Sequence, residues 1–184
     1  MTHWVYILKC KGGSLYVGET KRLFKRLSEH LSKKGCIHTG NYRPTKIMAL
    51  YRLSDMKKHI KGQYTSDKHF ALHVEYSITQ LLMKKYKNSK KIDIGYNNTE
   101  SFPGKTIKIP YCKCNLPASL HLYKGKYYWR CPKKNMKGYN SLFEYLADKR
   151  LRIDSKSCKF YNIEKLRHYS PVSYDMDIEI FGDD

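Results

Sequence analysis

Residues 4–30 constrain the fold more than any other stretch, because they predict two strands, a tight turn and a helix in close succession. Residues 4–10 and 15–18 are rich in the apolar and aromatic side chains that favour strands, and the Gly-Gly pair between them is typical of a hairpin turn. A helix then follows, with Thr20 as its candidate N-cap and an apolar stripe at helical spacing made of Leu23, Leu27 and Leu31.

Four polar side chains in this stretch are spaced so that they can meet. Tyr6 and Tyr16 lie ten residues apart, one on each predicted strand. Arg26 and His30 lie one helical turn apart at one edge of the apolar stripe. The stretch therefore offers two phenols, a guanidinium and an imidazole to one small surface, with ordinary strand packing as the alternative for the tyrosines.

Taken together, these residues resemble the motifs of the GIY-YIG nuclease superfamily in type and in spacing. The matching residues are Trp4-Val5-Tyr6, Tyr16-Val17-Gly18, Arg26 and His30. Trp4 replaces a frequent glycine of that family, but the two tyrosines that define the motif are kept. The resemblance implies an α+β (α/β) fold over residues 1–100, with a small three-stranded mixed sheet flanked by helices, and residues 45–53 are expected to supply the third strand.

A later helix, expected to begin at Thr65 or Ser66, carries Glu75 as its one acidic side chain beyond the first turn. An isolated glutamate in a helix is usually a solvated surface residue. The resemblance implies instead that Glu75 binds the single catalytic cation, Mg²⁺ or Mn²⁺, since a hard cation takes oxygen ligands and keeps several waters. Asn97, in a Tyr-Asn pair beyond this helix, is a further candidate on the same resemblance.

The resemblance also implies a reaction, the hydrolysis of DNA phosphodiesters. Arg26 would contact the phosphate and stabilise developing charge, and one tyrosine would activate the attacking water. Tyr16 is the favoured general base with Tyr6 in support, and the reverse assignment stays open. A phenol with a pKa near about 10 needs a nearby cation or base to act at neutral pH, and His30 would orient the tyrosine or accept its proton.

A large positive charge makes nucleic acid the expected partner. The chain has 36 Lys and Arg against 16 Asp and Glu, a formal net charge of +20, and such an excess attracts polyanions and speeds association. No membrane association is expected, since no long apolar or basic amphipathic segment supports it. Residues 32–44 are expected to form a basic loop, either solvated or in contact with DNA through Lys33, Lys34 and Arg43.

The second half of the chain, residues 110–170, carries a cysteine pattern. Its residues are Cys112, Cys114, Cys131 and Cys158, with Pro117-Ala118, Gly125-Lys126 and Phe160-Tyr161 around them. Four thiolates can close a tetrahedral Zn²⁺ site, and six cysteines without a signal peptide favour a reducing compartment. The pattern resembles the GRF-type zinc finger, which implies a small, zinc-stabilised, β-rich domain. The long gap before Cys158 leaves His121 and His168 as substitutes, and four buried free cysteines are the alternative to a metal site.

A basic and aromatic strand lies between these cysteines. Within it Lys126, Trp129 and Arg130 are candidates for base stacking and backbone contact with DNA, with core packing as the alternative for the aromatic side chains. A short helix is expected at residues 140–151. The acidic tail, residues 171–184, is expected to be solvated, with docking on a basic surface or a protein partner as the alternative.

The sequence therefore predicts a two-domain, divalent-metal-dependent DNA endonuclease, in which a zinc finger assists binding of duplex or branched DNA during repair, recombination or processing. One competing interpretation is a non-catalytic nucleic-acid-binding protein that keeps the nuclease fold, and another is a basic structural protein of a nucleoprotein particle. We expect an intracellular location, in the cytoplasm or nucleus, and the pairing of domains would suit a protein of a large DNA virus in an infected cell.

Overall fold

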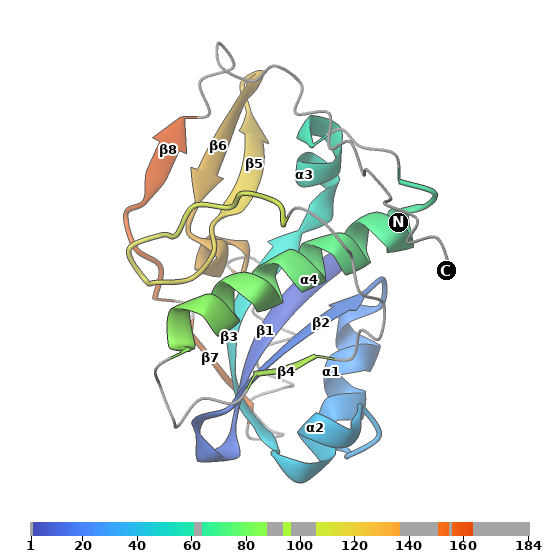
Figure 1. Ribbon diagram of the computed structural model, residues 1–184. Helices are drawn as coiled ribbons and strands as arrows, with labels where there is room; N and C mark the ends of the chain where they lie inside the picture. The colour runs from blue at the N-terminus through green and yellow to red at the C-terminus, as the bar shows by residue number, and fades with distance from the viewer. Residues whose placement is uncertain are drawn as a thin grey trace, which may run out of the picture.

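A computed structural model describes residues 2–60, 64–87, 94–96, 106–136, 151–154 and 156–163 (Figure 1). Strands and helices are mixed through the first half of the chain, and short strands prevail in the second half. In chain order the elements are β1 (Trp4–Cys10), β2 (Leu15–Thr20), α1 (Leu23–Leu31), α2 (Ile37–Asn41), β3 (Pro44–Arg52), α3 (Leu53–His59), α4 (Asp67–Tyr86), β4 (Ile94–Tyr96), β5 (Ser119–Tyr123), β6 (Lys126–Arg130), the 3₁₀ turn η2 (Pro132–Met136), β7 (Arg152–Ile153) and β8 (Tyr161–Ile163).

A five-stranded mixed sheet in the order β4-β2-β1-β3-β7 forms the centre of the molecule. The three expected strands make its antiparallel middle, because β1 pairs with both β2 and β3. Each edge gains a short parallel strand, β4 beside β2 and β7 beside β3. The expected α+β class with a small mixed sheet flanked by helices is therefore confirmed, and a second, antiparallel sheet in the order β5-β6-β8 forms the β-rich part of the second half.

Local sequence signals explain the hairpin and the long helix. Gly12 and Gly13 have φ angles of +73° and +86° in the turn between β1 and β2, a region that glycine enters without steric cost. Ser66 caps α4 by accepting a hydrogen bond from the His69 amide at 3.1 Å. Thr20 does not cap α1, which begins at Leu23; its hydroxyl accepts from the Arg22 amide in the turn before the helix.

Alternation along the strands divides the side chains between two faces of the sheet. One face, covered by α1, buries an apolar group that surrounds two tyrosines: Trp4, Tyr6, Leu8, Cys10, Tyr16, Leu23, Leu27, Ile47 and Leu50. The other face, crossed by α4 (Figure 1), buries a larger group that includes Val5, Ile7, Val17, Ala49, Tyr51, Phe70, Val74, Ile78 and Leu82. We call them the α1 face and the α4 face.

The core of the α4 face continues without a break into the second half of the chain. Ala118, Leu120, Trp129 and Cys131 belong to the same buried cluster as the side chains of α4. The Tyr51 hydroxyl donates to the Pro117 carbonyl at 2.8 Å, and both groups are buried. The second sheet is therefore packed against the first through both apolar contact and a buried hydrogen bond.

Several expectations fall on residues outside the described part of the chain. They concern Asn97, most of the helix at residues 140–151, His168 and the acidic tail at residues 171–184. The basic stretch at residues 32–44, expected to be a loop, contains the short helix α2. Among the described helices, none is long and apolar enough to cross a membrane.

Candidate active site and cysteine cluster

Tyr6, Tyr16, Arg26 and His30 come together on the α1 face, and we call this group the tyrosine cluster. The Tyr6 hydroxyl lies 2.7 Å from His30 Nε2, with both side chains buried. The Tyr16 ring stands edge-on to the His30 ring, with centroids 4.9 Å apart, and lies 6.3 Å from the Tyr6 ring. The spacing of the four residues in the sequence thus predicted their meeting in space.

Gly18 makes room for this cluster. Its Cα pairs with that of Tyr6 across the antiparallel strands β1 and β2, so both residues face α1. A Cβ added at Gly18 would come within 2.5 Å of the Tyr6 hydroxyl oxygen and 2.8 Å of Tyr16 Cε1. The glycine of the second motif is therefore needed for close packing of the two phenols.

Arg26 joins the tyrosine cluster to a cleft. Its guanidinium donates to Glu29 Oε2 at 2.9 Å, and its charge lies close enough to the Tyr6 hydroxyl to oppose the rise of the Tyr6 pKa. Its side chain also lines a cleft of about 380 Å³ whose wall is mostly cationic, with Lys21, Arg22, Lys25 and Lys68 beside His3, Glu19, Thr20 and Glu29. The cleft can hold a polyanion such that one anionic group lies against Arg26.

Burial sets the protonation state of the cluster. It raises the pKa of Tyr6 and of Tyr16 well above the usual value for a phenol. It also lowers the pKa of His30 to about 3, assisted by the nearby Arg26 charge. At neutral pH the cluster therefore contains two neutral phenols and a neutral imidazole, which can accept one hydrogen bond and donate another.

Glu75 reaches the same region from α4, on the opposite face of the sheet. It is 2% exposed, and burial together with the nearby Glu19 raises its pKa to about 8, against an opposing effect of Arg26. Glu19 is half-buried and lies near enough for its charge to act on Glu75, so the two side chains can offer carboxylate oxygens to one site. That chemistry fits a hard divalent cation completed by waters and phosphate oxygens.

Sequence reasoning did not single out Glu19, Thr39 or the lysines of the cleft. Glu19 pairs with His3, and a signal for it was available, since it follows Gly18 and alternation turns it to the α4 face. Thr39 lies 2.8 Å from His30 Nδ1. Its contact with His30 depends on the path of residues 32–36, which no spacing rule predicts.

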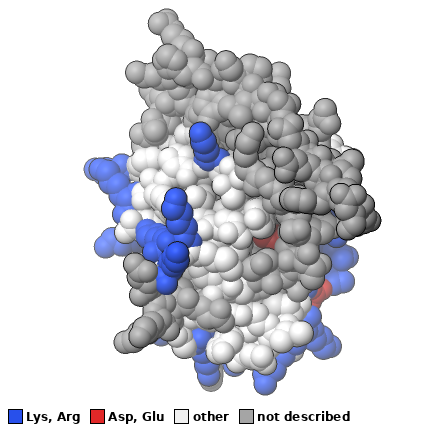
Figure 2. Space-filling view, viewed as in Figure 1, with Lys and Arg blue, Asp and Glu red and all other residues white. Residues whose placement is uncertain are grey.

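The residues expected to contact DNA lie in two places. Lys33, Lys34 and Arg43 are exposed on either side of α2, and Lys126 is exposed on β6. Trp129 is 3% exposed and packs in the core of the α4 face, which fits the core-packing alternative. Arg130 is half-buried and donates to Asn135 Oδ1 at 2.6 Å. Figure 2 shows that Lys and Arg prevail over Asp and Glu on the viewed face.

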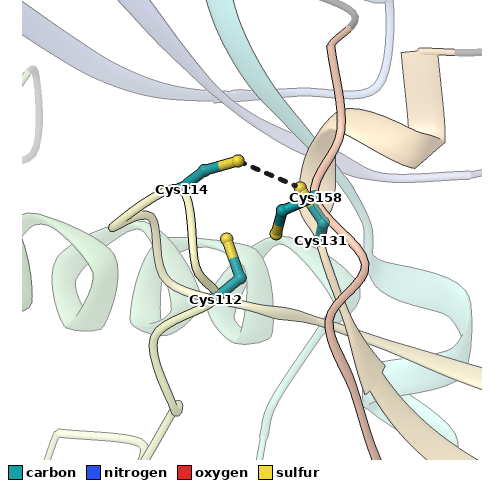
Figure 3. A group of neighbouring side chains, drawn as sticks. All are labelled: Cys112, Cys114, Cys131 and Cys158. Atoms are coloured by element: carbon teal, nitrogen blue, oxygen red, sulfur yellow. Dashed lines mark hydrogen bonds between the residues drawn. The ribbon is translucent and has the colours of Figure 1, made fainter.

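The four cysteines of the second half form a compact group, which we call the cysteine cluster (Figure 3). Cys112 and Cys114 come from the loop before β5, Cys131 follows β6, and Cys158 precedes β8. Their sulfur atoms all lie within 4.8 Å of one another, and those of Cys114 and Cys131 are 3.9 Å apart. A tetrahedral zinc site with Zn–S bonds of about 2.3 Å separates its sulfurs by roughly 3.8 Å, so the group fits Zn²⁺.

His121 is not part of this group. Its Nδ1 lies 3.1 Å from Asp55 Oδ2, in a contact between β5 and α3. The fourth sulfur therefore comes from Cys158, despite the long gap in the sequence. Burial raises the pKa of the Cys114 thiol to about 11, and a bound cation would favour its thiolate.

Comparison with known proteins covers the first half of the chain. A sequence profile of the GIY-YIG catalytic domain matches residues 2–88. A UPF0213 protein of Halalkalibacterium halodurans is 30% identical over 92 residues, which cover 50% of this chain and 97% of that protein. A UPF0213 protein of Fusobacterium nucleatum is 35% identical over 71 residues, which cover 33% of this chain and 71% of that protein. No solved structure matches the chain.

Proposed function

Because the chain belongs to the GIY-YIG catalytic domain family, with UPF0213 proteins among its relatives, we propose that it is a divalent-metal-dependent DNA endonuclease. The observation that supports this most directly is the tyrosine cluster, whose Arg26 both acts on Tyr6 through its nearby charge and lines a cationic cleft. Arg26 therefore belongs both to the tyrosine cluster, which is the proposed hydrolytic group, and to the cationic wall of the cleft, which is proposed to bind phosphate. Repair, recombination or processing of DNA inside the cell is the setting that we assign to this activity.

The cleft binds the DNA backbone. Lys21, Arg22, Lys25 and Lys68 supply point charges along its wall, and their neutralisation of phosphates releases counterions and makes binding depend on salt. Arg26 is half-buried and places its guanidinium between the cleft and Tyr6. A guanidinium in that position donates to the non-bridging oxygens of the scissile phosphate and stabilises the charge that develops on them.

Tyr6 is the tyrosine that we assign to the attacking water, in place of Tyr16. Its hydroxyl lies 2.7 Å from His30 Nε2 and can donate to it, which leaves its lone pairs to accept from a water beside Arg26. Full protonation of His30 at pH 7 would cost roughly 5 kcal/mol, at about 1.4 kcal/mol for each unit of pKa. His30 therefore orients the phenol, and takes up its proton only as the water attacks.

Glu75 is the residue that would hold the cation, with Glu19 beside it. A Mg²⁺ or Mn²⁺ ion bound there would polarise the phosphate and stabilise the leaving oxygen. Without a cation the Glu75 carboxyl is protonated at neutral pH, because burial raises its pKa to about 8. Binding of the ion must therefore displace a proton from Glu75.

The second half of the chain is proposed to bind Zn²⁺ through the cysteine cluster and to assist DNA binding. Lys126 is exposed on β6, and Lys124 lies over the ring of the exposed Tyr123 at the tip of the hairpin. An exposed aromatic ring beside lysines suits an unpaired base and its phosphate. Duplex DNA and branched DNA are the substrates to compare.

A second candidate function is DNA binding without cleavage. The observation in its favour is the burial of both phenols, since Tyr6 is 0% and Tyr16 is 1% exposed. For cleavage, bound DNA has to open the tyrosine cluster from the side of Arg26. A protein in which the tyrosine cluster never opens would bind DNA through the cleft without cutting it.

The test compares cleavage of labelled duplex, single-stranded and branched DNA with Mg²⁺ or Mn²⁺ by the parent chain and by Glu75→Gln. Asp67→Asn, an exposed carboxylate on the same helix, is the control. Cleavage that is lost only in Glu75→Gln, with DNA affinity retained, is the expected result. Tight binding by all three proteins without cleavage of any substrate would favour the second candidate, and cleavage by Glu75→Gln would place the metal elsewhere.

A further inference from the structure

A series of hydrogen bonds runs from the Tyr6 hydroxyl into the interior of the molecule. This hydroxyl lies beside the charge of Arg26, a residue of the cleft, and 2.7 Å from His30 Nε2. His30 Nδ1 lies 2.8 Å from Thr39 Oγ1, and Thr39 Oγ1 lies 3.4 Å from the carbonyl oxygen of Cys36. Thr39 is 0% and His30 is 1% exposed, so the inner part of this series excludes water.

The groups at the two ends of this series of hydrogen bonds fix the direction in which protons are donated along it. A guanidinium has donors and no acceptor, whereas a carbonyl oxygen only accepts. The Arg26 charge therefore attracts the lone pairs of Tyr6 and leaves its proton directed to His30, and Thr39 donates towards Cys36 and accepts from His30. The opposite direction would turn the hydroxyl proton of Tyr6 towards the hydrogens of the Arg26 guanidinium, where the like partial charges repel.

We propose that Thr39 is a positioning residue that holds His30 as the tautomer protonated at Nδ1, so that Nε2 accepts the proton of the Tyr6 hydroxyl. With that proton directed inwards, the lone pairs of Tyr6 face Arg26 and the cleft. The tautomer follows from the hydrogen bonds alone, whereas its use in orienting an attacking water rests on the proposed nuclease function.

The path of the chain after α1 supports this role. Gly35 passes so close to His30 that a Cβ there would overlap the imidazole ring. Helix α2 then turns Thr39 inwards while its first residue, Ile37, stays exposed. The Cys36 thiol lies 3.3 Å from Thr39 Oγ1 and can either accept from it or donate to it. In both cases the hydroxyl proton of Thr39 stays on the side of Cys36, so the direction of donation is unchanged.

The direct test is the tautomer of His30, read from the ¹⁵N chemical shifts of its ring nitrogens in the full-length protein at pH 7. The parent chain is expected to show a protonated Nδ1 and an unprotonated Nε2. Thr39→Ser, which keeps the hydroxyl, is expected to give the same pattern. Thr39→Val, which keeps the shape and removes the acceptor, is expected to shift His30 towards protonation at Nε2.

A parent chain with His30 protonated at Nε2 would overturn the proposal, even if the valine variant failed to fold. An unchanged Nδ1–H pattern in a folded Thr39→Val protein would also overturn it, because the tautomer would then not depend on Thr39. These readouts need no DNA and no divalent cation. They therefore stand or fall separately from the nuclease activity.

The kinetic test applies to an active parent chain. Thr39→Val is expected to lower kcat about 10- to 100-fold with KM unchanged, the range found for hydrogen-bond partners that orient a histidine ring, and Thr39→Ser is expected to restore it. A merely structural role would lower the thermal stability of both variants without separating their kcat values. Equal kcat for parent and Thr39→Val would contradict the positioning role, while an inactive parent would contradict the proposed function and leave the tautomer test in force.

Discussion

The two faces of the central sheet bury different chemistry. The α1 face encloses hydroxyl, imidazole and guanidinium groups, and the Tyr6 hydroxyl hydrogen-bonds to His30 at 2.7 Å. The α4 face encloses an apolar core that runs into the cysteine cluster, where Cys112 and Cys131 belong to it. The contrast indicates that the hydrogen-bonded polar cluster lies on one face and that the larger apolar core of the other face supplies most of the folding free energy.

Residues that follow each other along a strand face opposite sides of the sheet, so one belongs to the polar cluster of the α1 face and the next to the α4 face. Tyr16 faces α1 and Val17 faces α4, and the same alternation separates Gly18 from Glu19. Glu75 is the exception, because it is a titratable group buried on the apolar face. The comparison therefore predicts that damage to the α4 face is measured first as lost stability, and damage to the α1 face first as lost activity.

The largest expected effect follows from loss of the zinc ion that we propose for the cysteine cluster. Cys131 is 0% exposed and lies in the core of the α4 face. A structural zinc ion contributes roughly 10 kcal/mol or more in small zinc-binding domains, which is comparable to the whole stability of a domain, about 5–15 kcal/mol. We expect Cys131→Ser, or removal of zinc by a chelator, to abolish cooperative unfolding of the entire chain.

The measurement is thermal unfolding followed by far- and near-ultraviolet circular dichroism, with zinc content determined beside it. Cys10→Ala is the control, since Cys10 is buried on the α1 face, away from the cysteine cluster, and zinc should be retained. A first half that stays folded and melts separately would contradict the view that the core of the α4 face unites the two halves. Residues 1–100 and 110–170 would then be independent domains, as the sequence suggested.

A smaller effect on stability is expected at Glu75, where substitution at high pH stabilises the folded chain instead of destabilising it. The unfolded carboxyl releases its proton near pH 4.5 and the folded one near pH 8, so the folded chain holds an extra proton between these values. Stability therefore falls as pH rises through that window, by up to about 5 kcal/mol at about 1.4 kcal/mol per unit.

Without divalent cations, Glu75→Gln should consequently melt at a higher temperature than the parent at pH 9 and at a similar temperature at pH 5. Mg²⁺ should raise the melting temperature of the parent at pH 9 and leave that of Glu75→Gln unchanged. A parent chain whose stability is flat from pH 5 to pH 9 would show that the Glu75 carboxyl is already ionised in the fold.

Gly18→Ala tests whether damage to the α1 face lowers activity more than stability. The added methyl group would lie 2.5 Å from the Tyr6 hydroxyl oxygen, and overpacking of this kind costs roughly 1–3 kcal/mol. We expect a modest loss of stability and a large loss of cleavage, because the Tyr6–His30 hydrogen bond has to lengthen. Gly40→Ala is the matched control, since a Cβ there meets nothing within 4 Å and alanine favours helix. A Gly18→Ala protein that cleaves DNA as fast as this control would show that the tyrosine cluster tolerates displacement of Tyr6.

Much of this arrangement was predictable because it depends on local geometry. Alternation in β1 and β2 and the helical turn between Arg26 and His30 are short-range rules, and they placed the tyrosine cluster correctly. Glu75 needed the family resemblance, since nothing in its own helix distinguishes it from a solvated glutamate. The cysteine cluster followed from ligand chemistry, in which residue type is more informative than spacing.

The rest depended on contacts between distant segments. Trp129 sits among cationic residues in the sequence, yet it is buried because the second sheet packs against α4 and β3. Thr39 reaches His30 only because α2 forms in a stretch without helical periodicity. The cationic cleft joins residues of β2, α1 and α4, and no single segment shows that pattern.

The smallest expected effect concerns DNA binding at the two sides of the molecule. Lys25 lines the cleft, and Lys126 is exposed on β6 of the second sheet. A lysine that contacts one phosphate contributes about one to the slope of log affinity against log salt concentration, so each alanine variant should lower that slope by about one and weaken binding at physiological salt only a few-fold. Lys108→Ala, another exposed position, is the control for total charge. If Lys25→Ala lowers the slope and Lys126→Ala behaves like the control, DNA is held by the cleft alone, and the role left for the second half of the chain is to complete the buried core of the α4 face.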